Sequence, residues 1–282
     1  MSRKPQFLNT FLDFASAAFS WMCALLFVTL SALLMYSIFR TGLSQVDWAF
    51  ITEAPSNAGL SGGIAPIIVS TLLIVLVCIC ATVPFGLGTA IYLTEYLPSN
   101  SRVGAWVRTL LDTLAATPSI VFGLFGNAFF CVALGMELSI LSGGLTLACM
   151  VLPIFIRVAE AGIREVSDDH RRGAMALSLS KTTTTFQIVL PRAMPSLIAA
   201  FSLGLARALA ETAALIFTSG EAMRYPESLL DSGRSLSIHI YSLSTYGQTG
   251  LERGFATATV LVALLLIINS LTYLGLKFVS SK

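Results

Sequence analysis

Long apolar segments alternate with shorter polar segments along the whole chain. Six of the apolar segments approach or exceed the roughly 20 residues that an α-helix needs to span the hydrocarbon layer of a bilayer. They predict transmembrane helices at about residues 15–38, 63–93, 109–134, 139–156, 196–219 and 254–278. The sequence therefore predicts an all-α membrane protein with six transmembrane helices. We divide it into residues 1–62, a first helix with its outer connector, and residues 63–282, a core of five helices.

The overall composition agrees with this pattern. Hydrophobic residues make up 55% of the chain, charged residues only 11%, and the mean hydropathy is +0.82. These values exclude an ordinary soluble globular protein. The first apolar segment is too long for a signal peptide and is followed by no clean cleavage site, so we expect a retained helix. The five cysteines all lie inside apolar segments, and we interpret them as packing residues.

The distribution of positive charge predicts the orientation in the membrane. With the N-terminus inside, 12 of the 17 lysines and arginines lie on the cytoplasmic side, four lie outside and one, Arg207, lies within a helix. Cytoplasmic loops carry an excess of these residues. We therefore predict a multi-pass protein of a bacterial plasma (inner) membrane, with both termini and the long polar loop 157–195 in the cytoplasm.

Two features leave alternatives open. Pro118 lies at membrane depth in the third predicted helix, with glycines at 123 and 126, so this helix either packs closely in a bundle or lines a pathway. In the outer connector 220–253, residues 235–241 (SLSIHIY) alternate between polar and apolar side chains. They form either a short edge strand or an interfacial helix.

Enzyme chemistry finds little support in the sequence. None of the four lysines follows a glycine, so the phosphate-binding pattern GxxxxGK[ST] is absent. The patterns HExxH and GxSxG are absent as well. The two histidines, His170 and His239, fall on opposite sides of the membrane. We therefore predict no catalytic residue, no metal site and no cofactor.

Two charged residues lie inside the fifth predicted helix. Arg207 and Glu211 are four positions apart, which places them on one helical face. Each charge costs about 2.5–3.5 kcal/mol to insert at a helix centre. They form either a structural ion pair or part of a translocation pathway. Small residues recur at intervals of four in two rows, so we expect both faces of this helix to lie inside a bundle. The rows are Ala200, Gly204 and Ala208, and Ala206, Ala210 and Ala214.

The polar loop contains a stretch, 172–191 (RGAMALSLSKTTTTFQIVLP), with an apolar stripe, a turn and a second short helical segment. Such a shape is either an ordinary connection or a helix that docks into a partner's groove. The stretch resembles the coupling loop of binding-protein-dependent ABC importer permeases. Their pattern is Glu-Ala-Ala, three residues, Gly, nine residues, Ile-x-Leu-Pro. Ile188, Leu190 and Pro191 match its second half. Counting back, Ser178 takes the glycine position, and Arg172, Gly173 and Ala174 take the Glu-Ala-Ala positions.

Five further blocks extend the resemblance to about residues 60–276. They are GGIAPIIVSTLL (62–73), VPFGLGTAIYLTEY (83–96), ATPSIVFGLFG (116–126), LTLACMVLPIFIRVAEAGI (145–163) and RALAETAAL (207–215). In this order they resemble the permeases of phosphate ABC importers, the PstA-type subunit first and the sister PstC-type subunit second. The resemblance implies a non-catalytic subunit that forms half of the pathway for inorganic phosphate.

The resemblance also implies partners and a coupling site. The expected partners are a sister permease, an ABC ATPase dimer that hydrolyses ATP, an extracytoplasmic phosphate-binding protein and membrane lipid, with no nucleic acid. We expect Met175, Leu177 and Leu179 to supply the contact area with the ATPase, and Arg171 and Arg172 to lie at its rim. The expected coupling residues are Arg171, Arg172, Gly173, Ala174, Met175, Leu177, Ser178, Leu179, Ile188, Leu190 and Pro191. The competing class is an ion-driven secondary transporter of a small anion, in which Glu211 is the one candidate for binding the coupling ion.

Overall fold

The computed structural model describes residues 6–98 and 100–280, with side chains described over 13–98 and 100–275. The charge distribution predicts that both termini lie in the cytoplasm. The terminal residues themselves lie outside the described ranges. The strands are β1 (Pro55–Ser56) and β2 (Ser61–Gly62), and the helices are α1 (Gln6–Gly42), α2 (Trp48–Thr52), α3 (Ala65–Ile91), α4 (Arg102–Ala115), α5 (Ser119–Gly126), α6 (Ile140–Glu165), α7 (Asp168–Ala176), α8 (Lys181–Thr184), α9 (Leu190–Ala210), α10 (Ala213–Ile216), α11 (Leu236–Leu243) and α12 (Gly247–Ser280). Three of the helices continue into π-helical turns, which cover Tyr92–Tyr96, Asn127–Ala133 and Thr185–Val189.

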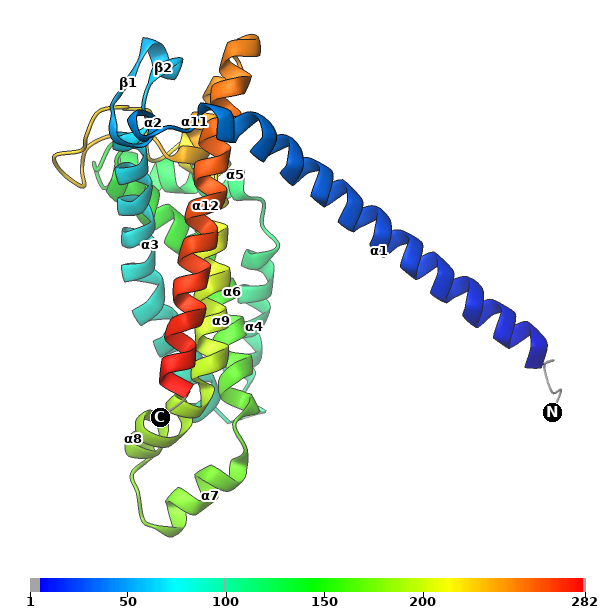
Figure 1. The fold of residues 1–282 in the computed structure, drawn as a ribbon. Helices are drawn as coiled ribbons and strands as arrows, with labels where there is room; N and C mark the ends of the chain where they lie inside the picture. Colours follow the sequence, from blue (N-terminus) through cyan, green and yellow to red (C-terminus); the bar gives the residue numbers. More distant parts are fainter. Residues whose placement is uncertain (1–5, 99, 281–282) are drawn as a thin grey trace.

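The predicted fold class is confirmed. Within the described residues, five helices are long and apolar enough to cross a membrane, and the bent pair α4 and α5 makes up to six. In Figure 1, α3, α4, α6, α9 and α12 run alongside one another as a bundle, and α7 and α8 extend beyond its lower end. The short connections α10 and α11, with the hairpin of β1 and β2, lie at the upper end.

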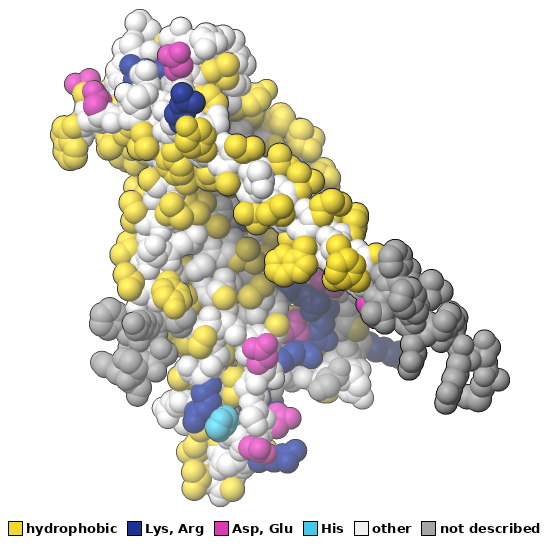
Figure 2. Space-filling model, turned by 45° about the vertical axis from the view of Figure 1, so that its right-hand side comes forward, with side chains coloured by type: hydrophobic (Ala, Val, Ile, Leu, Met, Phe, Trp, Pro, Cys, Tyr) yellow, Lys and Arg dark blue, Asp and Glu magenta, His cyan; other side chains and the backbone are white. Residues whose placement is uncertain are grey.

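Helix α1 leaves this bundle. The C-terminal end of α1 contacts α12. There Gly42 packs against Phe255, and the Thr259 hydroxyl donates to the Ile38 carbonyl at 3.4 Å. The rest of α1 points away from the bundle in Figure 1, and Figure 2 shows hydrophobic side chains along it. Its membrane-spanning part is not buried by this chain. Lipid or another subunit must therefore cover it.

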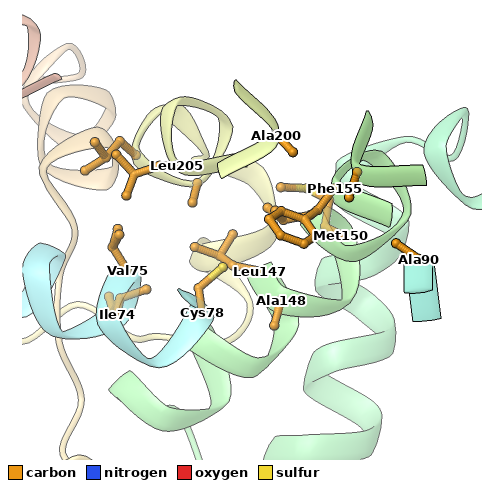
Figure 3. Close-up of a cluster of buried hydrophobic side chains, with 14 of the residues drawn as sticks. Ile74, Val75, Cys78, Ala90, Leu147, Ala148, Met150, Phe155, Ala200 and Leu205 are labelled. Atoms are coloured by element: carbon orange, nitrogen blue, oxygen red, sulfur yellow. The ribbon is translucent and has the colours of Figure 1, made fainter. Parts of the chain in front are cut away.

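The core lies where α3, α6 and α9 pack together. Figure 3 shows side chains from these helices meeting, among them Cys78 of α3, Met150 of α6 and Leu205 of α9. Glycines permit the close approach. A Cβ on Gly144 would collide with Val77 of α3 and one on Gly162 would collide with Ser196 of α9, as expected for tightly packed membrane helices.

The third predicted helix, 109–134, is wrong as a single element. A helix, α4, already begins at Arg102, where the Ser101 hydroxyl accepts from the Gly104 amide at 3.3 Å. The chain then bends by 98° between α4 and α5. Pro118 begins the second half, because the residue before a proline avoids helical backbone angles. The apolar pattern continues across this break and so conceals it.

The fourth and fifth predicted helices have different ends from those expected. Helix α6 continues nine residues past Ile156, to Glu165, because its last turns still bury Ala159 and Ile163. Helix α9 begins at Leu190, six residues before Ser196, and ends at Ala210. The loop between them is correspondingly shorter than predicted. The predicted continuation to residue 219 is broken at Glu211, which has an extended backbone, and is followed by the short α10.

The outer connectors are ordered and packed on the core. Residues 236–243 form a helix, α11, so the strand alternative is excluded; its N-cap Ser235 accepts from the Ile238 amide at 3.2 Å. In the first connector, β1 and β2 pair as a short antiparallel hairpin. Phe50 of α2 is buried in a cluster with Ile64, the N-cap residue of α3, and Leu236 of α11.

Candidate coupling site and translocation pathway

Helix α7 carries the exposed apolar side chains at the lower end of the bundle. Its N-cap Ser167 accepts from the Asp169 amide at 3.2 Å, and two aspartates in the first turn complement the helix dipole. Met175 and Leu177 are 65% and 75% exposed. The described chain does not cover these two large apolar side chains, which are therefore available to a partner.

The turn after α7 presents these side chains. The Leu179 amide donates to the Ala174 carbonyl at 3.1 Å, and the Ser178 amide donates to the Met175 carbonyl at 2.9 Å. This pair of hydrogen bonds is a Schellman motif, in which the residue after the helix C-cap has left-handed backbone angles. Ser178 accordingly has φ +57°. The position that the coupling-loop pattern reserves for glycine is thus the one whose backbone favours glycine.

The other expected coupling residues fall into two groups. Arg172 and Gly173 are exposed on α7, and Ala174 is buried. Leu190 is buried in the core, and Pro191 stands in the first turn of α9. The Ile-x-Leu-Pro half of the pattern therefore fixes the start of α9, and the first half forms the exposed segment.

Arg171, predicted at the rim of the ATPase contact, is engaged by groups of this chain. Its side chain is 20% exposed and pairs with the Glu95 carboxylate, 6% exposed, through Nη2–Oε1 at 2.7 Å. It also donates to the carbonyl oxygens of Ile163 at 3.0 Å and Val166 at 2.6 Å. The hydrogen bond that Arg171 donates to the Glu95 carboxylate raises the pKa of Arg171 above its ordinary value. By contrast the Arg172 side chain is 73% exposed, and its one carboxylate partner among the described residues is Asp169, at 4.0 Å.

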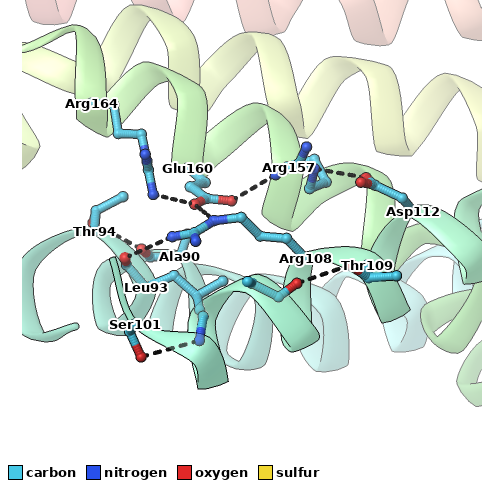
Figure 4. A network of polar contacts seen from close by, with 12 residues as sticks. Ala90, Leu93, Thr94, Ser101, Arg108, Thr109, Asp112, Arg157, Glu160 and Arg164 are labelled. Carbon is cyan, nitrogen blue, oxygen red and sulfur yellow. Dashed lines mark hydrogen bonds and ion pairs between the residues drawn. The ribbon is translucent and has the colours of Figure 1, made fainter. Parts of the chain in front are cut away.

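A second group of ion pairs surrounds Glu160 of α6 (Figure 4). Its carboxylate, 3% exposed, accepts from Arg108 of α4 at 2.6 Å, from Arg164 at 2.9 Å and from Arg157 at 3.1 Å. Arg157 also pairs with Asp112 at 2.9 Å. Three guanidinium groups thus share one buried carboxylate, which joins α4 to α6.

The two groups meet at the π-helical end of α3. Arg108 donates to the carbonyl of Leu93, and Arg171 binds Glu95 two residues later. Lys181 of α8 lies over the ring of Tyr96, 5.1 Å from its centroid. Between these groups lies a cavity of about 560 Å³, lined by Leu93, Thr94, Glu95, Leu97, Arg164, Asp168, Arg171, Met175, Leu179, Lys181 and Thr184. The ends of α3 and α6 and the start of the coupling segment therefore form one polar junction, which sequence reasoning did not identify.

The intramembrane charges are arranged differently from the prediction. Because α9 ends at Ala210, Arg207 and Glu211 do not share a helical face, and the described residues show no ion pair between them. The Glu211 carboxylate accepts from the Ala214 amide at 3.2 Å and so stabilises the break between α9 and α10. Arg207 has no carboxylate partner among the described residues, and its Nε is buried without a hydrogen-bond partner. The ion-pair interpretation is therefore wrong for this structure.

The break in α9 lies beside the π-helical continuation of α5. The Asn127 side-chain amide donates to the carbonyl of Phe217 at 2.7 Å, and Gly123 leaves room for Ala214. Backbone groups that the broken helices free are thus satisfied by neighbouring protein, as membrane depth requires. The two rows of small residues on α9 also differ. Ala200, Gly204 and Ala208 are buried, whereas Ala206 is half-buried and Ala210 exposed. Ala214, the last member of the second row, is buried beyond the break on α10. Within this chain one face of α9 is buried and Ala210 is exposed, and the burial of both faces stays a prediction.

Comparison with protein families identifies the class of protein. The model of the binding-protein-dependent transport system inner membrane component family matches residues 82–282. The chain belongs to this family. It is 30% identical to the probable ABC transporter permease protein YqgI of Bacillus subtilis, over 90% of this chain and 91% of the relative. It is 31% identical to the phosphate transport system permease protein PstA 1 of Mycobacterium tuberculosis, over 79% and 73%.

A third relative and the solved structures extend the comparison. A PstA homolog of Mycoplasma pneumoniae is 36% identical over 71% of this chain, which spans about a third (32%) of that protein. Among solved structures, an inward-facing MetNI methionine ABC transporter has a TM-score of 0.60 at 18% identity, over 77% of this chain and 95% of that one. An amino acid ABC transporter has a TM-score of 0.54 at 16% identity, over 75% and 91%. These two likenesses show the fold, which is that of ABC importer permeases. The predicted resemblance to PstA-type permeases is confirmed.

Proposed function

We propose that this chain is a permease subunit that forms half of the translocation pathway for inorganic phosphate in an ATP-driven importer. The observation that carries the proposal is the exposed apolar segment of α7 at one end of a permease bundle, in a chain with several PstA relatives. A chain of this class is generally a non-catalytic component, and ATP hydrolysis belongs to a partner ATPase. An external phosphate-binding protein delivers the cargo.

The coupling segment docks on the ATPase through Met175, Leu177 and Leu179. Covering a large apolar side chain contributes about 1.5–3 kcal/mol, so these side chains supply a substantial part of the contact energy. Movement of the ATPase then shifts the bundle between outward-open and inward-open arrangements. A sister permease supplies the other half of the pathway and covers the face of α9 that carries Ala210.

The cargo meets Arg207. An arginine without a carboxylate partner at membrane depth offers a planar set of donors to a phosphate oxygen. The hydroxyl-rich break at the outer ends of α9 and α5 gives the anion polar neighbours as it passes. Affinity for phosphate resides chiefly in the external binding protein, so the permease site is weak and transient.

The orientation in the inner membrane follows from the charge distribution, with α7 in the cytoplasm. A cysteine placed at Arg172, which is exposed, reacts with impermeant thiol reagents only in inverted vesicles. A cysteine at Glu227, in the opposite connector, serves as the control and reacts from outside intact cells. Reaction of the cysteine at position 172 from outside intact cells would overturn the proposed topology.

The substitution Leu177→Asp tests the coupling role. It places a charge in the apolar contact, where an unpaired buried charge costs several kcal/mol, so ATP-dependent phosphate uptake is lost while the membrane level of the protein holds. Gln187→Asp adds the same charge at an exposed polar position and leaves uptake intact. Normal uptake by the Leu177 variant, or uptake by the wild type without ATP, would contradict the proposed function.

A further inference from the structure

We propose that Arg171 is a positioning residue that locks α7 to both α3 and α6, so that ATPase movement reaches the transmembrane helices instead of bending the coupling segment. This inference rests on the proposed function, because it concerns how the coupling segment transmits force. The proposed role differs from docking. Met175, Leu177 and Leu179 touch the ATPase, whereas Arg171 makes their movement reach the transmembrane helices.

The joint between α6 and α7 is short and contains no helical turn. Helix α6 ends at Glu165 and α7 begins at Asp168, so only Val166, with extended backbone, and Ser167, with non-helical backbone, connect them. Of the residues of α7, only Ala174 is buried. The angle between the two helices therefore depends on the few contacts that cross the joint.

Arg171 makes hydrogen bonds that cross this joint. Its guanidinium donates to the carbonyls of Ile163 and Val166, which belong to the unsatisfied last turn of α6. The same group binds both oxygens of Glu95 at the end of α3, at 2.7 and 3.4 Å. One side chain of α7 thus binds groups on two transmembrane helices. A lysine, with a single ammonium group, cannot reproduce this planar arrangement.

Burial decides which arginine matters. The side chains of Arg171 and Glu95 are mostly shielded from solvent, so water and salt screen their attraction little. Arg172, the next residue, is exposed, and its contact with Asp169 is at the limit of an ion pair. Because Arg172 belongs to the expected ATPase contact, the matched control is Arg192, an exposed arginine of α9 that donates to the Ile188 carbonyl at 3.2 Å.

The first experiment measures coupling in the complete transporter reconstituted with its binding protein. Arg171→Gln assembles and hydrolyses ATP, but phosphate imported per ATP falls roughly tenfold or more, because a buried ion pair is broken. Arg192→Gln, at an exposed arginine outside the expected coupling residues, keeps the wild-type ratio. Glu95→Gln retains an acceptor for Arg171 and the bonds to α6, and it gives an intermediate ratio. The exchange Arg171→Glu with Glu95→Arg restores opposite charges but not the donors to the α6 carbonyls, so it stays uncoupled.

Two outcomes would overturn the inference. An unchanged ratio in Arg171→Gln would show that the lock is unnecessary, and a parallel fall of hydrolysis and import would show that Arg171 acts in docking alone. A second measurement does not depend on the cargo. Spin labels at Tyr92, in the π-helical turn that follows α3, and at Ala176 on α7, both exposed, give one narrow distance distribution in the wild type and in Arg192→Gln, and a broad one in Arg171→Gln. A narrow distribution in Arg171→Gln refutes the lock, whereas failure of the wild type to import phosphate refutes only the proposed function.

Discussion

The two ends of the bundle differ in how their charged side chains are paired. At the end near α7, Glu95 and Glu160 are buried and each is bound by arginine. Near the break of α9, Arg207 has no carboxylate within reach among the described residues, although Glu211 is close in sequence. Paired charges join helices, and an unpaired cation is available to an anion. From this contrast we propose that the lower end transmits the movement of the ATPase and that the upper half meets the cargo.

The largest expected effect lies in the upper half. We predict that Arg207→Gln abolishes phosphate uptake while the complex still assembles, because the substitution removes the unpaired cation from the pathway. Uptake of labelled phosphate by cells, together with copurification of the complex, measures both parts. Arg224→Gln, an exposed arginine on the outer connector, is the control and transports normally.

Substitution of Glu211 gives a second test of whether Arg207 acts without a carboxylate partner. Glu211→Gln keeps an oxygen for the Ala214 amide and removes the charge, so we expect it to retain most uptake. If Arg207 and Glu211 acted as an ion pair, the two substitutions would be equally harmful. Equal loss in both variants would break the comparison between the two ends.

A smaller effect, on stability, is expected at the lower end. Glu160→Gln leaves Arg108 without a counter-charge in a buried site, and breaking such a pair costs about 3 kcal/mol. Asp112→Asn removes a more exposed partner of Arg157, and exposed pairs contribute about 1 kcal/mol or less. Thermal unfolding of the purified permease in detergent ranks the two. If both substitutions lower the midpoint alike, burial does not govern these pairs.

Hydrophobic pattern alone predicted much of this fold. The six apolar segments, the long polar loop and the exposed Leu177 follow from it directly. It missed the breaks at Pro118 and Glu211, because apolar residues continue on both sides of each break and only backbone geometry records the interruption. It also missed the junction, because Glu95 and Arg171 are 76 residues apart and Arg108 and Glu160 are 52 apart. The spacing of Arg157, Glu160 and Arg164 on one helical face was the signal available.

The smallest expected effect concerns the turn that presents the coupling segment. Ser178 has φ +57°, a backbone conformation that costs a residue with a side chain about 1–2 kcal/mol. Ser178→Gly relieves this strain, although a more flexible unfolded chain offsets part of the gain. We expect the turn to be stabilised by about 1 kcal/mol, so that the amides of Ser178 and Leu179, which close the Schellman motif, exchange with deuterium about fivefold more slowly.

The same substitution two residues later gives the opposite sign. Ser180 has φ −64°, and its hydroxyl caps α8 by accepting from the Thr183 amide at 3.1 Å. Ser180→Gly therefore removes a cap without relieving strain and weakens α8 by a few tenths of a kcal/mol. Hydrogen exchange followed by mass spectrometry separates the two peptides. Faster exchange in both variants would mean that the left-handed turn at Ser178 is not the resting state of the segment, and that α7 adopts its exposed form only against the ATPase.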